Sequence, residues 1–188
     1  MINDDYYEIY ENLCNEVGRA FQDAAILKCI RDSSKVIFDK KHPTNQIVFH
    51  LCELTKMDLA LTIYKIWLDN KSKKTVKSFN KAFPNRRGIK LKLTDNTRII
   101  EKPLREIRNK YLAHIDPTKE LISLDVDLMI DALIEISEMI SAIGNNSIDE
   151  RVLPIPKNCF NIIKMKTMIG FEPMINHLFN KEEEQNNA

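Results

Sequence analysis

The chain has 188 residues, of which 44% are hydrophobic and 29% are charged, and this suits one globular domain with a substantial core. It contains only four glycines, which disfavours turn-rich β-sandwiches, and no apolar run reaches the roughly 18 residues of a membrane span. The N-terminus lacks the basic region that begins a secretory signal, and the four cysteines form no Cys-x-x-Cys pair. We therefore expect a cytoplasmic protein with reduced thiols.

The net charge of +1 conceals two segregated segments. Residues 71–92 carry seven lysines and two arginines without any acidic residue, whereas residues 125–150 carry seven acidic residues without any lysine or arginine. A basic face of this kind suits an anionic ligand or a charge match with a partner. A solvated lysine-rich loop and an unrelated acidic helix face give the same pattern, so the charge distribution leaves both interpretations open.

Apolar residues recur at three- and four-residue steps in the first part of the chain and predict two long amphipathic helices. The first spans residues 6–30. The second begins at Pro43 or Thr44 and ends near residue 70, and a short helix is expected over residues 75–83.

The next predicted helix carries the residues of most chemical interest. Pro103 is expected to be its first residue, because the missing N–H of proline would be unpaired at that position in any case. The helix is expected to end near residue 115, since Pro117 disfavours helical geometry at Asp116.

Ser123 is placed to cap a further helix over residues 124–143, which Gly144 would close, and two shorter helices are expected later, separated between Gly170 and Pro173. The fold class that follows is all-α: a bundle of four main helices with short additional helices. The expected organisation is a bundle over residues 1–144, a helical extension packed on it over residues 145–180, and a disordered tail over residues 181–188.

Arg108 and His114 lie six positions apart near the end of the helix that is predicted to begin at Pro103, which we call the motif helix. A guanidinium stays charged and neutralises a phosphate, while an imidazole titrates near neutral pH and moves protons in both directions. These two groups supply what RNA cleavage without metal requires when the 2′-hydroxyl attacks the adjacent phosphate. On an ideal helix the two side chains point about 120° apart, so two copies meeting across a twofold axis would serve one phosphate better. A catalytic interpretation therefore predicts a homodimer.

Other polar residues complete the predicted site. Asn109 offers an amide that can hold His114 or a phosphate. The residues expected to bind the RNA backbone are Arg105, Lys110, Lys74, Lys77, Arg86 and Arg87. We expect no metal and no cofactor, because the other histidines show no ligand spacing and no glycine-rich phosphate loop is present. Basic residues also commonly end helices to offset the helix dipole, which is the structural alternative for Arg108 and His114.

The run Arg-Asn-Lys-x-x-Ala-His-Ile-Asp over residues 108–116 resembles the signature of the HEPN superfamily (higher eukaryotes and prokaryotes nucleotide-binding), and most closely its AbiU-like abortive-infection branch. The resemblance covers roughly residues 6–143. It implies a helical bundle that dimerises with paired motifs in a shared cleft. Many relatives are metal-independent endoribonucleases of toxin–antitoxin or antiphage systems, so the resemblance also implies this activity. By this resemblance Arg108 would stabilise the phosphate, His114 would be the acid and base, and Asn109 would support them.

One position departs from the family pattern. Relatives paired with a nucleotidyltransferase antitoxin often carry tyrosine two positions after the histidine, whereas this chain has Asp116. Control by nucleotide transfer onto that tyrosine is therefore not supported, although an antitoxin protein stays a possible partner. Some family members serve only as binding or dimerisation modules, which is the main alternative function. A nucleotide-binding role, with Arg105 and Arg108 on the phosphates, is a third.

Overall fold

The computed structural model describes residues 4–32, 43–69, 71, 72, 74–81, 95–113, 124–145 and 155–186. This part of the chain forms six helices and contains no strand, which confirms the all-α prediction. The helices are α1 (Asp4–Asp32), α2 (Pro43–Trp67), α3 (Val76–Lys81), α4 (Asp95–Ala113), α5 (Val126–Asn145) and α6 (Cys159–Asn186).

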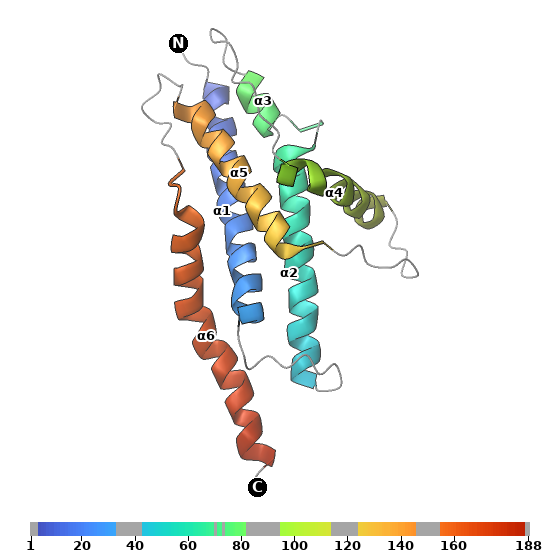
Figure 1. The fold of residues 1–188 in the computed structure, drawn as a ribbon, viewed down its shortest axis with the longest axis vertical. Coiled ribbons are helices and arrows are strands. Elements are labelled where there is room, and N and C mark those ends of the chain that lie inside the picture. Colours follow the sequence, from blue (N-terminus) through green and yellow to red (C-terminus); the bar gives the residue numbers. More distant parts are fainter. Residues whose placement is uncertain are drawn as a thin grey trace.

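The long helices α1 and α2 lie along the main axis of the molecule, and α5 runs obliquely across them (Figure 1). Helix α6 packs along α1, while α4 packs on both α2 and α5. Figure 1 shows α4 crossing the bundle at a steep angle, with its C-terminal end projecting from the side. Among the described residues no helix has the length and apolar character that crossing a bilayer requires.

Helix α1 supplies one wall of the core through an apolar stripe at helical spacing. Leu13, Val17 and Phe21 lie on this stripe and are buried almost completely. At the N-terminal end of α1, the rings of Tyr6 and Tyr10 stack on Phe79 of α3, with centroids 4.8 and 5.6 Å apart respectively. These contacts attach the six-residue helix α3, which is too short to be stable alone, to the bundle.

The motif helix starts eight residues before the predicted position. Helix α4 begins at Asp95, and Pro103 lies inside it, so the prediction that Pro103 is the first residue was wrong. The reason is the buried stripe of Thr97, Ile100 and Leu104, which begins before the proline and continues to Ile107. Ile100 is the large apolar side chain that the extension before the proline buries. Its burial contributes about 1.5–3 kcal/mol, which offsets most of the ~3 kcal/mol cost of an interior proline.

Helix α5 also begins differently from the prediction. The Oδ1 atom of Asp125 accepts hydrogen bonds from the backbone N–H groups of Asp127 (2.8 Å) and Leu128 (3.5 Å). Asp125 is therefore the N-cap, two residues after Ser123, which lies outside the described residues. At the other end Gly144 is buried within the helix, which continues to Asn145 and is not closed by the glycine.

Helix α6 is continuous where two shorter helices were expected. It passes through Gly170 and Pro173 and extends to Asn186, so it includes residues 181–186 of the segment predicted to be disordered. The glutamates and glutamine of residues 182–185 are strong helix formers, which favours this extension. The side chains of Phe160, Ile163 and Phe171 pack on the bundle and fix one face of α6.

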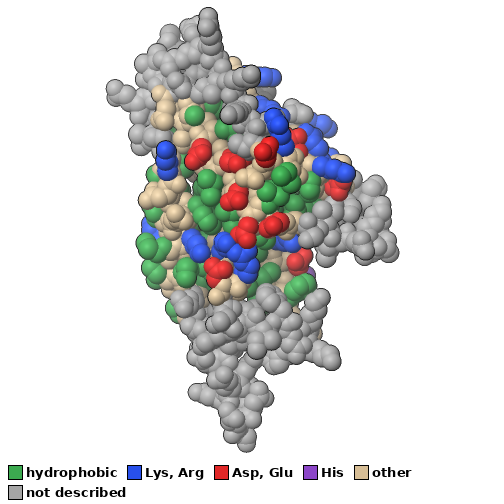
Figure 2. All heavy atoms as spheres, in the orientation of Figure 1, with side chains coloured by type: hydrophobic (Ala, Val, Ile, Leu, Met, Phe, Trp, Pro, Cys, Tyr) green, Lys and Arg blue, Asp and Glu red, His purple; other side chains and the backbone are tan. Residues whose placement is uncertain are grey.

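The opposite face of α6 is apolar but exposed. Ile162, Met165 and Ile169 recur at three- and four-residue steps and are 38%, 59% and 70% exposed. Figure 2 shows hydrophobic side chains along this outer edge of the molecule. A second exposed apolar stripe runs along α2 through Ile47, Leu51 and Leu54.

Ion pairs join α1 to its neighbours. The carboxylate of Asp127 in the first turn of α5 accepts from Arg31 at 2.5 Å and from Lys28 at 2.8 Å. These hydrogen bonds from Arg31 and Lys28 lower the pKa of Asp127 to about 2. Lys164 of α6 pairs with Asp32 of α1 at 3.2 Å. Because these side chains are partly solvated, each pair contributes at most about 1 kcal/mol, so they orient helices that apolar burial holds together.

We predict that Leu104→Ala lowers the free energy of unfolding by about 2–5 kcal/mol, because Leu104 is fully buried where α4 packs on the bundle. Urea unfolding followed by circular dichroism measures this change. Ile99→Ala on the same helix is the matched control and should change stability by less than about 0.5 kcal/mol, since Ile99 is 58% exposed. Equal losses from the two variants would contradict the packing of α4 described above.

Candidate functional site

Arg108 is half-buried on α4 and is held by uncharged groups. Its Nη1 atom donates a hydrogen bond to Oδ1 of Asn109 at 3.1 Å, and its Cζ atom lies 5.9 Å from the ring centroid of Tyr64 on α2. No carboxylate of a described residue forms an ion pair with it. The ring and the amide orient the guanidinium without neutralising it, so its charge stays free to bind a phosphate.

The structure places some predicted site residues and not others. Asn109 is exposed and accepts its hydrogen bond from Arg108, and Arg105 is exposed about one turn earlier on α4. Lys110 belongs to α4 as well. His114 follows the last residue of α4 and lies outside the described residues, as do Arg86 and Arg87.

Lys74 and Lys77, two of the predicted RNA-binding residues, both contact the bundle. The Nζ atom of Lys74 pairs with Glu8 of α1 at 3.2 Å. The Nζ atom of Lys77 lies 5.5 Å from the ring centroid of Trp67. The cation–π contact leaves the charge of Lys77 available, whereas Lys74 would have to release Glu8 before binding a phosphate.

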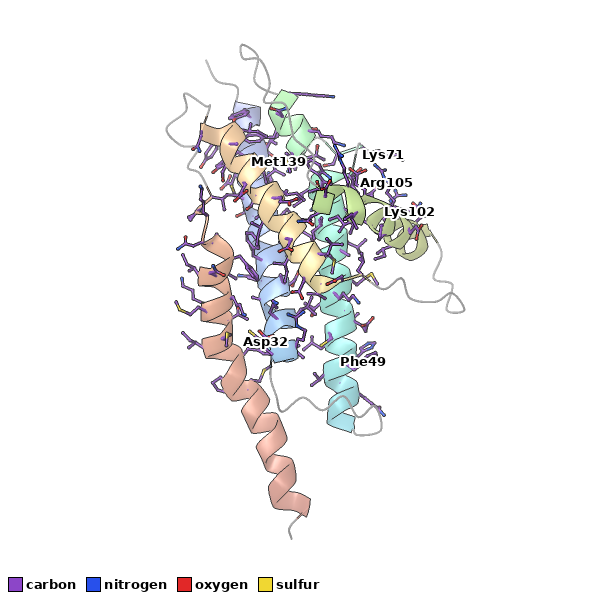
Figure 3. The ribbon with its side chains drawn as sticks, in the orientation of Figure 1. Asp32, Phe49, Lys71, Lys102, Arg105 and Met139 are labelled. Atoms are coloured by element: carbon purple, nitrogen blue, oxygen red, sulfur yellow. The ribbon has the colours of Figure 1, made fainter. Side chains whose placement is uncertain are left out.

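Two basic residues near the motif were not singled out from the sequence. Arg98 and Lys102 are exposed on α4 and share its outward face with Arg105 and Asn109, at steps of four, three and four residues. Figure 3 shows Lys102 and Arg105 on α4, with Lys71 on the same side of the molecule. The spacing was present in the sequence, but a helix expected to begin at Pro103 does not include Arg98 or Lys102.

A separate titratable cluster lies between α1 and α2. Burial and the nearby carboxylate of Asp58 raise the pKa of Asp23 to about 6. Nη2 of Arg19 donates to Oδ1 of Asp58 and to Oγ1 of Thr62, both at 3.1 Å. Perturbed carboxyl groups occur at functional sites and also in structural ion-pair networks. Arg19 already bridges the two helices here, which indicates a structural role for the cluster.

A cleft of about 400 Å³ opens beside the facing ends of α1, α2 and α5. Phe49 and Cys52 of α2 line it together with Arg31 of α1. Burial raises the pKa of the Cys52 thiol to about 11, so the cysteine is protonated at neutral pH and is a poor nucleophile. Arg31 is already paired with Asp127. Neither Cys52 nor Arg31 is therefore poised for chemistry in this cleft, and Figure 3 shows Phe49 well away from Lys102 and Arg105.

Among the described residues, no group of three or more His, Cys, Asp or Glu side chains is arranged to hold a metal ion. Comparison with protein-family models, with curated proteins and with solved structures finds no match to this chain. The resemblance to the HEPN superfamily accordingly depends on the motif at residues 108–116 and its place in an all-α chain.

We predict that Asp23→Asn raises the free energy of unfolding by about 1 kcal/mol at pH 7.5, after allowance for partial solvation. The pKa of Asp23 is higher in the folded protein, so the wild type loses stability as pH rises from about 4 to about 6 and the variant lacks this loss. Urea unfolding between pH 4 and pH 7.5 measures the difference, which should vanish near pH 4. Asp131→Asn, at an exposed position on α5, is the control; an equal gain there would contradict the assignment.

Proposed function

We propose that this protein is a metal-independent endoribonuclease of the toxin or antiphage-defence type that acts as a homodimer. The observation that carries the proposal is the state of Arg108: an oriented guanidinium, held by Asn109 and Tyr64 and not paired with any described carboxylate. This state suits a residue that must bind a phosphate, because an ion pair with a carboxylate would compete with the substrate.

In the proposed reaction a histidine removes the proton from a 2′-hydroxyl, whose oxygen then attacks the adjacent phosphorus. The bond to the 5′-oxygen breaks, and a second imidazolium gives that oxygen a proton. The products are a 2′,3′-cyclic phosphate and a 5′-hydroxyl. Arg108 stabilises the negative charge that develops on the phosphoryl oxygens, and His114 from each chain supplies one of the proton steps.

The homodimer is part of the proposal because one continuous helix would not bring the two motif residues together. On an ideal helix, side chains six positions apart point about 120° apart and are separated by about 9 Å along the axis. The C-terminal end of α4 projects from the side of the bundle, where a second copy can approach it (Figure 1). Two such ends meeting across a twofold axis would place two arginines and two histidines around one phosphate.

We predict that the wild-type protein cleaves total RNA or tRNA in excess EDTA and that His114→Ala and Arg108→Ala do not. Loss of the acid–base group or of the phosphate-stabilising charge should each lower kcat by at least about 100-fold. Gel electrophoresis with detection of 2′,3′-cyclic phosphate ends provides the measurement. His50→Ala, at an exposed position on α2, is the matched histidine control and should retain full activity.

The dimeric arrangement makes a further prediction. The mechanism uses His114 from both chains, so a mixed dimer of one wild-type chain and one His114→Ala chain should be no more active than the His114→Ala homodimer. The two proteins are refolded together, and mixed dimers are isolated through an affinity tag on the variant chain. If these mixed dimers kept half of the wild-type activity, each chain would act alone and the composite site would be wrong.

The alternative is a non-catalytic helical module that binds a partner or dimerises. The exposed apolar stripes on α2 and α6 favour this alternative, since large apolar side chains grouped on a surface commonly mark interaction sites. An antitoxin protein is one possible partner of either version. Absence of cleavage by folded, dimeric wild-type protein, together with loss of association in Arg108→Ala, would favour the module over the nuclease.

A further inference from the structure

The outward face of α4 carries a basic stripe, formed by Arg98, Lys102 and Arg105, that begins nearly three turns before Arg108. All three side chains are exposed, while Ile100, Leu104 and Ile107 on the opposite face are buried. The stripe is about 10 Å long from Arg98 to Arg105, and Arg108 lies about 5 Å further along the helix axis. Side chains spaced along a helix in this way can reach successive phosphates of one RNA strand.

The basic stripe is not neutralised by its own helix. Glu101 and Arg105, and Lys102 and Glu106, are four residues apart and are spaced for ion pairs on a solvated helix surface. Among the described residues no ion pair involves any of these side chains. On α1, by contrast, the cations Arg19, Lys28 and Arg31 each lie against a carboxylate.

The basic stripe also has basic neighbours. Lys71, in the turn after α2, is exposed and lies on the same side of the molecule as Lys102 and Arg105 in Figure 3. Figure 2 shows mostly basic side chains over α3 and α4, with an acidic side chain beside those of α4, and acidic side chains over α5. An RNA strand approaching this face therefore meets a positive field near α4 and a negative one over α5, which directs it along α4.

We propose that the basic stripe of Arg98, Lys102 and Arg105 is a phosphate-binding track that holds the RNA backbone and leads it to Arg108. This inference rests on the proposed function for the identity of the ligand, and it adds Arg98 and Lys102 as binding residues. Contacts to phosphates carry no sequence information, so the track supplies affinity and register without base preference.

The test compares the full-length wild type with two variants that lose equal charge. Arg98→Gln/Lys102→Gln removes two charges from the track, and Lys157→Gln/Lys166→Gln removes two exposed charges before and within α6. The probe is a fluorescent, fully 2′-O-methylated RNA oligonucleotide, which lacks the attacking hydroxyl and cannot be cleaved. Fluorescence anisotropy gives the Kd at several salt concentrations. Thermal melting confirms folding, since glutamine preserves helix propensity at these exposed positions.

We expect the track variant to bind about tenfold more weakly and to reduce the salt slope of log Kd by about 1.4, at roughly 0.7 for each phosphate contact. The α6 variant should bind like the wild type. With cleavable RNA, the track variant should raise KM and leave kcat nearly unchanged, whereas Arg108→Ala should lower kcat.

Three results would overturn the track: wild-type protein that does not bind the oligonucleotide, the same affinity loss in both charge variants, or a track variant that keeps the wild-type Kd. Failure of the proposed function looks different. If the wild type cleaved no RNA in EDTA but the track variant alone lost binding, the track would stand and the nuclease would not. If cleavage occurred and the track variant kept the wild-type KM and Kd, the nuclease would stand without the track.

Discussion

The packing of α4 across α2 and α5 is the constraint on which the candidate site depends. Ile100 and Leu104 are fully buried in this contact, and their burial fixes the rotation of α4 about its own axis. Once that rotation is fixed, Arg98, Lys102 and Arg105 must face outward, and Arg108 must lie at the boundary beside Tyr64. The charged residues of α4 thus owe their positions to apolar side chains on its other face.

Ion pairing divides the molecule into two regions. Around α1, cations and carboxylates alternate between helices: Arg31 and Lys28 hold Asp127, and Lys164 holds Asp32. These ion pairs orient α5 and α6 on α1, and the paired charges neutralise each other. On α4 the described cations form no ion pair with a described carboxylate, and Arg108 is held by a ring and an amide. Charge that forms no ion pair with another described residue is available for an anionic ligand, and Arg98, Lys102, Arg105 and Arg108 on α4 are of this kind.

The exposed apolar side chains give a second functional constraint. Helix α6 is apolar on the face that packs on the bundle and also on the opposite face, where Met165 and Ile169 are mostly exposed. Helix α2 exposes Ile47 and Leu54 in the same way. Surfaces of this kind favour association. They are compatible with a protein that works as an assembly, and they lie on helices other than the one that carries the motif.

The sequence by itself determined the all-α class and the approximate extent of α1, α2, α3 and α5. Apolar residues at steps of three and four lie on one face of a helix, so their spacing predicts helices directly. It also determined Arg108, Asn109 and His114 as the residues to test, because their chemistry does not depend on the fold. It misplaced the start of α4, since a proline at position 103 is read locally as a helix start. Only the tertiary structure could decide that the helix extends in front of the proline, because Thr97 and Ile100 are buried there against other helices. The same decision brought Arg98 and Lys102 onto the helix of the motif, and the packing of α4 on α2 put Arg108 beside Tyr64, a contact between residues 44 positions apart that no local pattern encodes.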